Sequence, residues 1–311
     1  MKIVVAGGTG LVGRALAQSL ARDGHEVILL TRQAGMTHEL PSGVRLLAWD
    51  SATADGWLAA ADGADAMVNL AGENLAAGRW NERRKRAVLE SRLGAGAAAV
   101  DFVRQAAQRP TVLIQASAVG YYGPSDELLL DEDTPPGDDF LARVCQAWEA
   151  STRPVEALGV RRVVVRLGVV WSAAAGALPR MVLPFRWFVG GPLGSGRQWL
   201  SWVHIADQVR ALRFLIETPA AHGAYNVSAT PLRNQEFAQA LGKVLRRPAR
   251  FPVPASVIRL LFGEMGTVVL DGQHVSARRL TDLGFQFRFP QAEMALRDLL
   301  IDRKEESRHD S

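Results

Sequence analysis

The chain begins with the stretch Ile3-Val-Val-Ala-Gly-Gly-Thr-Gly-Leu-Val-Gly13, in which an apolar run is followed at once by glycines at three-residue spacing. Each of these glycines has a physical task in a turn that joins a strand to a helix. Gly7 permits the tight turn, Gly10 lets the backbone approach a pyrophosphate, and Gly13 lets the helix pack on the strand. The N–H groups and the dipole of that helix would point at the anion. The stretch therefore predicts a dinucleotide site.

The residues around the glycines support this interpretation. Residues 3–6 predict a short strand, residues 14–23 predict a helix that ends at Gly24, and residues 26–31 predict a second strand. The spacing alone is a weak signal, because a chain with 29 glycines produces chance spacings. A purely structural glycine turn is the alternative.

Composition sets the broad class of the protein. A chain of 311 residues can bury one large α/β core with a smaller lobe appended. The net charge is +4, and the basic residues are spread along the chain, so we expect no nucleic-acid partner. The longest basic cluster, residues 83–86, lies in a predicted helix and is interpreted as a solvated face, with an anion-binding patch as the alternative.

Other features of the composition bear on location and on metals. Cys145 is the only cysteine, so no internal disulfide can form. No signal peptide precedes the first strand, and no apolar stretch reaches membrane-spanning length without interruption. We therefore expect a soluble, cytoplasmic protein with no membrane partner. Histidines and carboxylates show no metal-ligand spacing, so no metal is predicted.

Strand and helix patterns alternate along the first half of the chain. Further buried strands are predicted where short, β-branched apolar runs lie between turn residues: 44–48, 66–71, 111–116 and 162–167. Helices are predicted at three places: residues 55–61, 81–108 and 139–158. Pro154 should kink or restart the last helix. The alternation predicts an α/β fold, a Rossmann-like doubly wound parallel sheet whose ligands lie at the carboxyl ends of the strands.

The pattern changes after residue 170. Residues 173–200 are rich in proline and glycine and predict no long periodic element. We interpret them as an excursion that faces the substrate. Helical patterns return at residues 235–245 and 256–261.

These changes suggest how the chain is divided. We expect a nucleotide-binding Rossmann domain over residues 1–172, to which residues 201–232 return. A smaller, mostly helical substrate lobe is expected from residues 173–200 and 233–302. The charged residues 303–311 predict a flexible tail.

Further motifs follow the glycine stretch along the chain. They are Asn69-Leu-Ala-Gly72, Ser117 with Gly120-Tyr-Tyr-Gly123, Arg166-Leu-Gly-Val-Val170, Trp202-Val-His-Ile-Ala-Asp207 and Tyr225-Asn-Val227. In order and spacing they resemble the extended short-chain dehydrogenase/reductases over nearly the whole chain. The resemblance implies a Rossmann fold that binds NAD or NADP.

A second set of motifs is similar to one branch of that superfamily. Its members are Gly72-Glu-Asn74, Arg79-Trp80, Leu178-Pro-Arg-Met181, Gly194-Ser-Gly-Arg-Gln198, Leu270-Asp-Gly-Gln273 and Gly284-Phe-x-Phe287. They resemble the atypical epimerase-like branch. That branch is similar to nucleotide-sugar epimerases and ends in a small C-terminal domain of unknown function of the DUF1731 type.

The choice between the two dinucleotides can be argued from charge. An NAD site places an acidic residue at the end of the second strand, whereas the 2′-phosphate of NADP needs a cation there. Here the strand ends at Thr31 and Arg32, and Arg14 follows the glycine turn. We therefore expect NADP(H), with NAD less favoured. The alternative is that Arg32 stacks on the adenine and accepts either cofactor.

Other cofactor contacts follow from the resemblance. Asp50 resembles the acidic position that contacts the adenine, and Ala71 with Gly72 resemble the segment that passes under the cofactor. The full set of expected cofactor residues is Gly7, Thr9, Gly10, Leu11, Val12, Gly13, Arg14, Thr31, Arg32, Asp50, Leu70, Ala71, Gly72, Glu73 and Arg166.

The catalytic residues of the superfamily are only partly matched. There a tyrosine and a lysine four residues later, with a serine, manage the proton that accompanies hydride transfer. The matching helix has Leu141 and Cys145 at these positions, or Phe140 and Val144 in the alternative register. The residues left for the task are Ser117, Tyr121 and Tyr122, which lie beside the expected nicotinamide.

Two readings of the activity stay open. The first is an NADP(H)-dependent oxidoreductase or epimerase-like enzyme that lacks the tyrosine–lysine pair and acts on an unknown small molecule. The second is an NADP(H)-binding sensor or regulatory protein with little or no turnover. The candidate substrate residues are Asn74, Arg180, Arg197 and His204, the two arginines being suited to an anionic group. Family members are often dimers through the two long helices, so a homodimer is possible.

Overall fold

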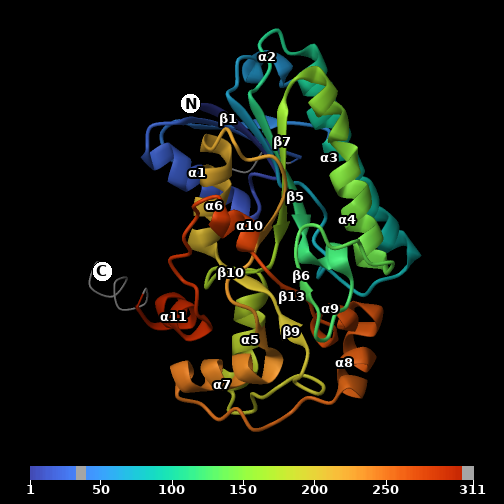
Figure 1. The fold of residues 1–311 in the computed structure, drawn as a ribbon, viewed down its shortest axis with the longest axis vertical. Coiled ribbons are helices and arrows are strands. Elements are labelled where there is room, and N and C mark those ends of the chain that lie inside the picture. The colour runs from blue at the N-terminus through green and yellow to red at the C-terminus, as the bar shows by residue number, and fades with distance from the viewer. Residues whose placement is uncertain (33–39, 303–311) are drawn as a thin grey trace.

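The computed structural model describes residues 1–32 and 40–302 (Figure 1). The tail predicted at residues 303–311 lies outside these ranges. The described chain forms one large sheet wrapped by helices, with a second group of smaller elements at one end.

The large sheet has seven parallel strands in the order β11-β7-β5-β4-β1-β2-β3. The strands are β1 (Lys2–Ala6), β2 (Glu26–Thr31), β3 (Val44–Ala48), β4 (Ala66–Asn69), β5 (Val112–Ala118), β7 (Arg161–Leu167) and β11 (Gly223–Val227). The central strands are apolar on both sides because both faces are covered. The predicted doubly wound fold is confirmed.

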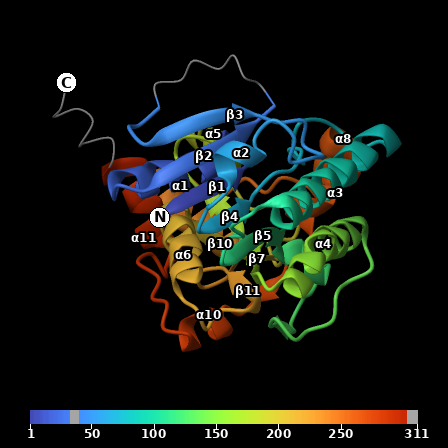
Figure 2. The same cartoon turned by 90° about the horizontal axis from the view of Figure 1, so that it is seen from above.

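Helices cover the two faces of this sheet. Figure 2 shows α1 (Leu11–Arg22) and α6 (Ile205–Glu217) on one face, and α3 (Glu82–Gln105) and α4 (Phe140–Ser151) on the other. Alternate residues of β1 serve the two sides: Ile3 packs in the same core cluster as α1, and Val4 in the same cluster as α3.

The strand order reverses between β1 and β4. From β1 the chain proceeds to β2 and β3 on one side, whereas β4 leads to β5, β7 and β11 on the other. Connections leave the carboxyl ends of β1 and β4 in opposite directions, and in doubly wound sheets ligands bind beside such a reversal. The glycine turn after β1 and the loop after β4 therefore face each other where ligands of this fold bind.

Most of the remaining elements gather at one end of the molecule, in what we call the second lobe, whereas the helix Arg278–Asp282 packs on β11 and places Leu280 in the core of the large sheet. The remaining elements are β8 (Val169–Trp171), α5 (Ala177–Arg186), β9 (Trp199–Leu200), β10 (Trp202–His204), β12 (Leu232–Arg233), α7 (Asn234–Leu245), α8 (Ala255–Phe262), α9 (Thr267–Leu270), β13 (His274–Val275), α10 (Arg278–Asp282) and α11 (Ala292–Arg297). Two short elements lie outside the second lobe in sequence: α2 (Leu58–Ala61) and β6 (Leu129–Leu130), which pairs with β13. At the centre of the lobe, the indole of Trp171 stacks on that of Trp202 at 4.0 Å.

One prediction about these elements is wrong and another is confirmed. Residues 173–200 contain the ten-residue helix α5, although no long element was expected there. Pro179 lies in its first turn, where a backbone N–H has no partner to lose. The helix predicted at residues 139–158 ends at Ser151, and a 3-10 helix restarts at Arg153 with Pro154 in its first turn, as expected.

Candidate active site

The glycine turn brings β1, α1 and the loop after β4 into close contact. Gly7 has a φ of +74°, and a Cβ there would lie 2.8 Å from the amide nitrogen of Ala71. A Cβ on Gly13 would lie 2.5 Å from the carbonyl oxygen of Gly7. Since these neighbours are backbone atoms that cannot yield, both positions require glycine. The only atom near a Cβ on Gly10 is the carbonyl oxygen of Gly7 at 3.2 Å, so its outer side is open.

The N-terminus of α1 has the features of an anion-binding site. Gly10 is its N-cap, no side chain caps the helix, and the first turn contains no acidic residue. The first-turn N–H groups, from Leu11 and Val12 onward, therefore have no helical acceptor and point outward with the positive end of the dipole. Thr9 is half-buried in the turn, and Arg14 is exposed just beyond it. This arrangement fits the pyrophosphate of a dinucleotide.

At the end of β2, Arg32 already has an anionic partner. Both of its terminal nitrogens donate to Oε1 of Glu73 at 3.2 Å. Nη1 of Arg84, from α3, donates to the other carboxylate oxygen at 3.1 Å. Burial alone would raise the pKa of Glu73, but the hydrogen bonds and charges of these two arginines lower it below its ordinary value. A carboxylate thus lies between two cations where a phosphate was expected beside Arg32.

The basic cluster at residues 83–86 is divided between two environments. Arg83 and Arg86 are exposed, as the prediction of a solvated face requires. Arg84 is turned inward to Glu73, and the ammonium group of Lys85 lies 2.6 Å from a carboxylate oxygen of Glu264. Half of the cluster therefore binds anionic groups of the protein itself.

The other predicted adenine-side residues lie close by. Thr31 is buried as the last residue of β2. Asp50 is exposed, and its carboxylate accepts hydrogen bonds from the backbone N–H groups of Thr53 and Ala52. Chiefly because of the Thr53 bond, its pKa is lowered. Both carboxylate oxygens of Asp50 are thus used to hold its own turn.

The loop after β4 is supported from below by a buried cation that the sequence analysis missed. Arg92 of α3 is 8% exposed, and its guanidinium carbon would lie 3.0 Å from a Cβ on Gly72. It donates to the carbonyl oxygen of Glu73 at 3.3 Å and lies 4.7 Å from the ring centroid of Trp148. Burial lowers its pKa. The sequence did contain a signal for this position: Arg92 lies four residues after the apolar Val88, which puts both on the same face of the helix.

Polar residues lie in one row across three strands at the carboxyl end of the sheet. Ser117 on β5, Arg166 on β7 and Asn226 on β11 are register partners in successive parallel pairs. Arg166 lies at the centre of the row and is 4% exposed. A buried row of this kind is stable only when each polar group has a partner.

Glu149 of α4 is the main partner of Arg166. The guanidinium makes two bonds to its carboxylate, Nε to Oε1 at 2.9 Å and Nη2 to Oε2 at 3.0 Å. Nη1 donates to the hydroxyl of Tyr122 at 3.0 Å. Burial alone would lower the pKa of Arg166, but the Glu149 carboxylate raises it, so the cation is permanent. Through Glu149 and the hydroxyl of Tyr122, Arg166 is linked to Ser117 on β5 and Asn226 on β11.

Two of the three candidate catalytic hydroxyls belong to this network. Ser117, 1% exposed, donates to Oε1 of Glu149 at 2.7 Å. The hydroxyl of Tyr122 donates to the side-chain oxygen of Asn226 at 2.8 Å while it accepts from Arg166. Burial raises the pKa of Tyr122 to about 12. Both hydroxyls are therefore neutral and already bonded within the protein.

Tyr121 differs from its neighbour. Its side chain is half-buried, and its ring meets that of Tyr122 edge to face at 5.3 Å. The guanidinium carbon of Arg166 lies 3.5 Å from its ring centroid, a close cation–π contact. Within the described chain, no residue forms a hydrogen bond with its hydroxyl.

The helix face opposite these residues is apolar. Leu141 packs near Gly120, where a Cβ would lie 3.5 Å from its own. Cys145 is buried, and burial raises its pKa to about 11, so its sulfur is a neutral thiol. Neither side chain can hold or move a proton as the superfamily's tyrosine and lysine do.

The predicted substrate residues are dispersed. Arg180 on α5, Arg197 before β9 and Asn74 after β4 are exposed. His204 is instead fully buried at the N-cap of α6: Nδ1 accepts from the backbone N–H of Ala206 at 3.0 Å, and Nε2 lies 3.1 Å from the carboxylate of Asp298. Both ring nitrogens of His204 are thus engaged inside the protein, at the start of α6.

Comparison with known families decides the relationship that the motifs suggested. The pattern of the NAD dependent epimerase/dehydratase family matches residues 3–228, well over half of the chain. The chain belongs to this family. A second pattern, a domain of unknown function (DUF1731), matches residues 253–299. The expected C-terminal domain of this epimerase-family protein is confirmed.

Relatives of this epimerase-family protein occur in animals, plants and bacteria. "Epimerase family protein SDR39U1" of Mus musculus is 40% identical, covering 96% of this chain and 100% of the relative. "Epimerase family protein YfhF" of Bacillus subtilis is 36% identical, covering 98% and 99%. The chloroplastic homologue of SDR39U1 in Arabidopsis thaliana is 39% identical, covering 96% and 87%.

Solved structures include a relative of similar length. The human epimerase family protein SDR39U1, crystallised with NADPH, has a TM-score of 0.88 at 38% identity, covering 97% of this chain and 100% of that one. A UDP-galactose 4-epimerase has a TM-score of 0.75 at 21% identity, a likeness that concerns the fold alone. The predicted membership of the extended, epimerase-like branch is confirmed.

The described residues of this epimerase-family chain were searched for metal-ligand groups and for membrane-spanning helices. Residues 1–32 and 40–302 contain no group of three or more histidine, cysteine or carboxylate side chains that could hold a metal ion. Over the same residues, no helix is both long and apolar enough to span a membrane.

Proposed function

We propose that this chain is an NADP(H)-dependent oxidoreductase of the epimerase-like type, acting on a small substrate that carries a hydroxyl or carbonyl group. The cofactor part of the proposal is supported by the uncapped start of α1 and by Arg32 at the end of β2. It is also supported by the human relative that was crystallised with NADPH. When bound, this cofactor supplies or accepts a hydride. The protein must then manage the proton that accompanies it.

Residues of the first domain would hold the cofactor. First-turn N–H groups of α1 suit the pyrophosphate, and the cations of Arg32 and Arg14 suit the 2′-phosphate. The loop of Leu70, Ala71 and Gly72 would pass beneath, braced by its backbone contact with Gly7. Arg32 must exchange Glu73 for the phosphate when the cofactor enters.

Tyr121 is the proposed proton donor and acceptor. The hydroxyls of Ser117 and Tyr122 donate hydrogen bonds to Glu149 and Asn226, respectively. The hydroxyl of Tyr121 forms no hydrogen bond with a described residue. This uncommitted hydroxyl carries the proposal, because a proton donor needs a hydroxyl that the substrate can reach. The Arg166 guanidinium on its ring fixes the orientation of the phenol and favours the anion that proton release leaves.

The second lobe would supply substrate contacts. Arg180 and Arg197 are exposed cations on that lobe and suit a phosphate or carboxylate group of the substrate. Asn74, on the loop that follows β4, would bind from the cofactor side. A small anionic carbonyl or alcohol is thus the substrate class we propose.

The test is the rate of NADPH oxidation with a panel of quinones, aldehydes and nucleotide-sugar ketones. Tyr121→Phe should lower kcat by about 10²- to 10⁴-fold, the usual contribution of a positioned proton donor. Its affinity for NADPH should not change, since the hydroxyl does not bind cofactor in this proposal. Ser117→Ala should lower kcat less than Tyr121→Phe does, because the hydroxyl of Ser117 is already bonded to Glu149.

Matched variants keep this test interpretable. Tyr122→Phe removes a hydroxyl of the same kind from a buried position, and should reduce stability more than the chemical rate. If Tyr121→Phe oxidises NADPH as fast as wild type on every active substrate, Tyr121 is not the proton donor.

A specific observation favours the sensor or regulatory alternative. The inner face of α4 presents Leu141 and the neutral thiol of Cys145 at positions that the resemblance assigns to the superfamily's proton-handling pair. Tight NADPH binding without turnover over the whole panel would support this second candidate and contradict the first.

We also propose a cytoplasmic homodimer. The two long helices α3 and α4 pack against each other on one face of the sheet and would provide the self-complementary surface. Sedimentation equilibrium tests this part: a mass of one chain at micromolar concentration would contradict it.

A further inference from the structure

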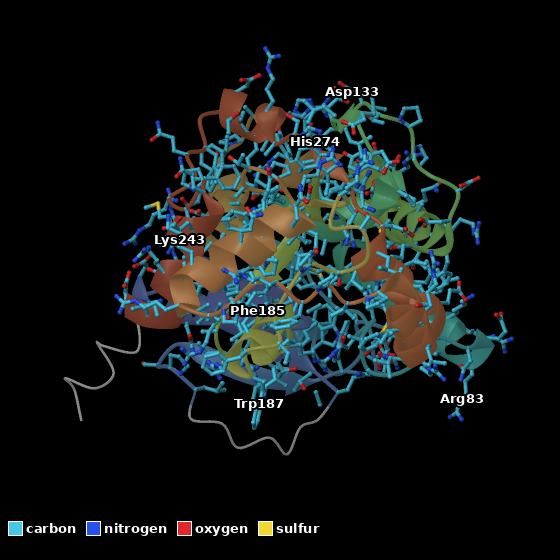
Figure 3. The ribbon with its side chains drawn as sticks, turned by 90° about the horizontal axis from the view of Figure 1, so that it is seen from below. Arg83, Asp133, Phe185, Trp187, Lys243 and His274 are labelled. Carbon is cyan, nitrogen blue, oxygen red and sulfur yellow. The ribbon has the colours of Figure 1, made fainter. Side chains whose placement is uncertain are left out.

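Exposed aromatic side chains gather where α5 ends. Trp187, Phe188 and Val189 are 73%, 52% and 55% exposed. Phe251 is 53% exposed and lies beside them, since its backbone N–H donates to the carbonyl oxygen of Gly190 at 3.2 Å. We call these four residues and the arginines next to them the arginine–aromatic patch. Figure 3 shows Trp187 projecting outward at the edge of the molecule.

One ring of the patch is carried by a residue in a conformation that favours glycine. Phe188 has a φ of +63°, in the left-handed region where glycine is favoured. Stability of the folded chain alone would favour glycine at this position. The ring contacts Arg247, whose guanidinium carbon lies 4.3 Å from its centroid. The left-handed residue ends α5, since the N–H groups of Phe188 and Val189 donate to the carbonyl oxygens of Phe185 and Pro184, and it leaves the phenylalanine ring half-exposed.

The surroundings of the patch are positively charged. Arg186 precedes Trp187, while Arg246, Arg247 and Arg250 precede Phe251, and all four are exposed. None of them forms an ion pair with a residue in the described ranges. Residues 157–206 and 237–263, which supply the patch, contain no Asp or Glu. The patch therefore combines projecting apolar rings with uncompensated cations.

This chemistry distinguishes between kinds of partner. Tryptophan and arginine are also enriched at protein–protein hot spots, where a projecting ring fills a pocket of the partner, so a protein partner is the outcome that the test below must separate. Here the apolar side chains project from the protein by half or more of their surface, so they would enter a partner rather than receive one. A bilayer accepts such rings at the level of its headgroups, where tryptophan is enriched, and its anionic phosphates attract arginine.

We propose that the arginine–aromatic patch docks the protein on an anionic lipid surface. Trp187, Phe188 and Phe251 insert at the headgroup boundary, and the arginines pair with lipid phosphates. The contact is peripheral, which agrees with the absence of a spanning helix among the described residues. It replaces the initial expectation of no membrane partner. Figure 1 shows α5 and α7, whose ends carry the patch, at one end of the molecule, and Figure 3 shows Trp187 projecting at the side of that end.

Co-sedimentation with vesicles tests the proposal. The full chain should bind vesicles of phosphatidylcholine with about one quarter phosphatidylglycerol, and bind pure phosphatidylcholine at least about tenfold more weakly, as charge-dependent attraction requires. Binding should weaken as salt is raised. The emission of Trp187 should shift to shorter wavelength on binding, and Trp187→Phe should remove that shift.

Variants separate the patch from general stickiness. Trp187→Ser with Phe188→Gly should lower binding to anionic vesicles at least about tenfold, and the glycine relieves the strained backbone, so folding is preserved. Arg186→Gln with Arg247→Gln should remove the preference for anionic lipid. Two controls should bind as wild type: Leu128→Ser, which removes an equally exposed apolar residue elsewhere, and Arg83→Gln with Arg86→Gln, which removes exposed charge from α3. NADPH affinity, measured on each variant, reports folding.

Three results would overturn the proposal. The first is equal binding of the wild type to neutral and anionic vesicles, or none to either. The second is equal loss in the patch variants and in the Leu128 control. The third is concentration-dependent self-association that Trp187→Ser abolishes, since a second copy of the chain would then be the partner.

Discussion

At the residue scale, the carboxylate of Glu73 competes with the cofactor for Arg32. Arg32 is 64% exposed on its side chain, and an exposed ion pair of this kind contributes at most about 1 kcal/mol. Glu73→Gln should therefore tighten NADPH binding by up to about fivefold, because the 2′-phosphate no longer displaces a charge. NADH, which has no 2′-phosphate, should bind as before. Isothermal titration of both cofactors measures the effect.

Two further variants give this prediction its control and its opposite. Arg84→Gln removes the second partner of Glu73 and leaves the carboxylate to Arg32 alone, so NADPH should bind more weakly. Glu26→Gln breaks a comparable exposed pair with Arg45 and should change neither cofactor. Weaker NADPH binding in Glu73→Gln would mean that Glu73 itself contacts the cofactor.

At the element scale, Glu149 joins α4 to the sheet. Its carboxylate accepts from Ser117 on β5 and twice from Arg166 on β7, and these side chains are 14% and 5% exposed for Glu149 and Arg166. Glu149→Ala leaves a buried guanidinium without its counter-ion, which costs about 3–5 kcal/mol of stability. Urea unfolding of the apo protein should register this loss as a lower midpoint.

Glu156→Ala provides the comparison. Glu156 also pairs with an arginine, Arg162, but its own side chain is 48% exposed. Its removal should cost less than about 1 kcal/mol. Equal losses in the two variants would contradict the buried network that we describe.

The elements differ in how far sequence predicts them. Six strands of the large sheet, β1 to β5 and β7, were located to within two residues, because buried parallel strands are short apolar runs between turn residues. Helix α5 was missed because Pro179 and Pro184 are read as breakers, yet its buried Leu178, Val182 and Phe185 have helical spacing. The apolar spacing of a helix was therefore present in the sequence, but the two prolines led us to expect no helix there.

The site divides in the same way. The turn glycines Gly7, Gly10 and Gly13 were predicted because the turn itself is local in sequence, whereas the contact of Gly7 with the backbone of Ala71 was not. The bond of Ser117 to Glu149 joins positions 32 residues apart and depends on how α4 packs on β5, which no local spacing reveals. The contact of His204 with Asp298 likewise joins residues far apart in sequence, since Asp298 directly follows α11 near the end of the described chain.

At the scale of the whole molecule, the two lobes meet over the row of polar residues. Asn226 in the row donates to the carbonyl oxygen of Ser276 at 3.0 Å, and Arg279 of α10 bonds Asp133 at 2.6 Å. The first lobe carries the proposed cofactor residues, while Arg180 and Arg197 come from the second. The proposed reaction therefore needs both lobes, with Tyr121 at their junction.

We propose that Arg32 gives the protein its preference for NADP(H), and the affinities for the two cofactors measure this preference. Quenching of tryptophan fluorescence should give a Kd for NADPH about tenfold or more below that for NADH, the size expected of a charge-assisted bond. Arg32→Asp should abolish or reverse that preference, because it replaces the phosphate's cation with an acceptor for a ribose hydroxyl. Equal, weak binding of NADPH and NADH to the wild type would contradict the proposed preference for NADP(H).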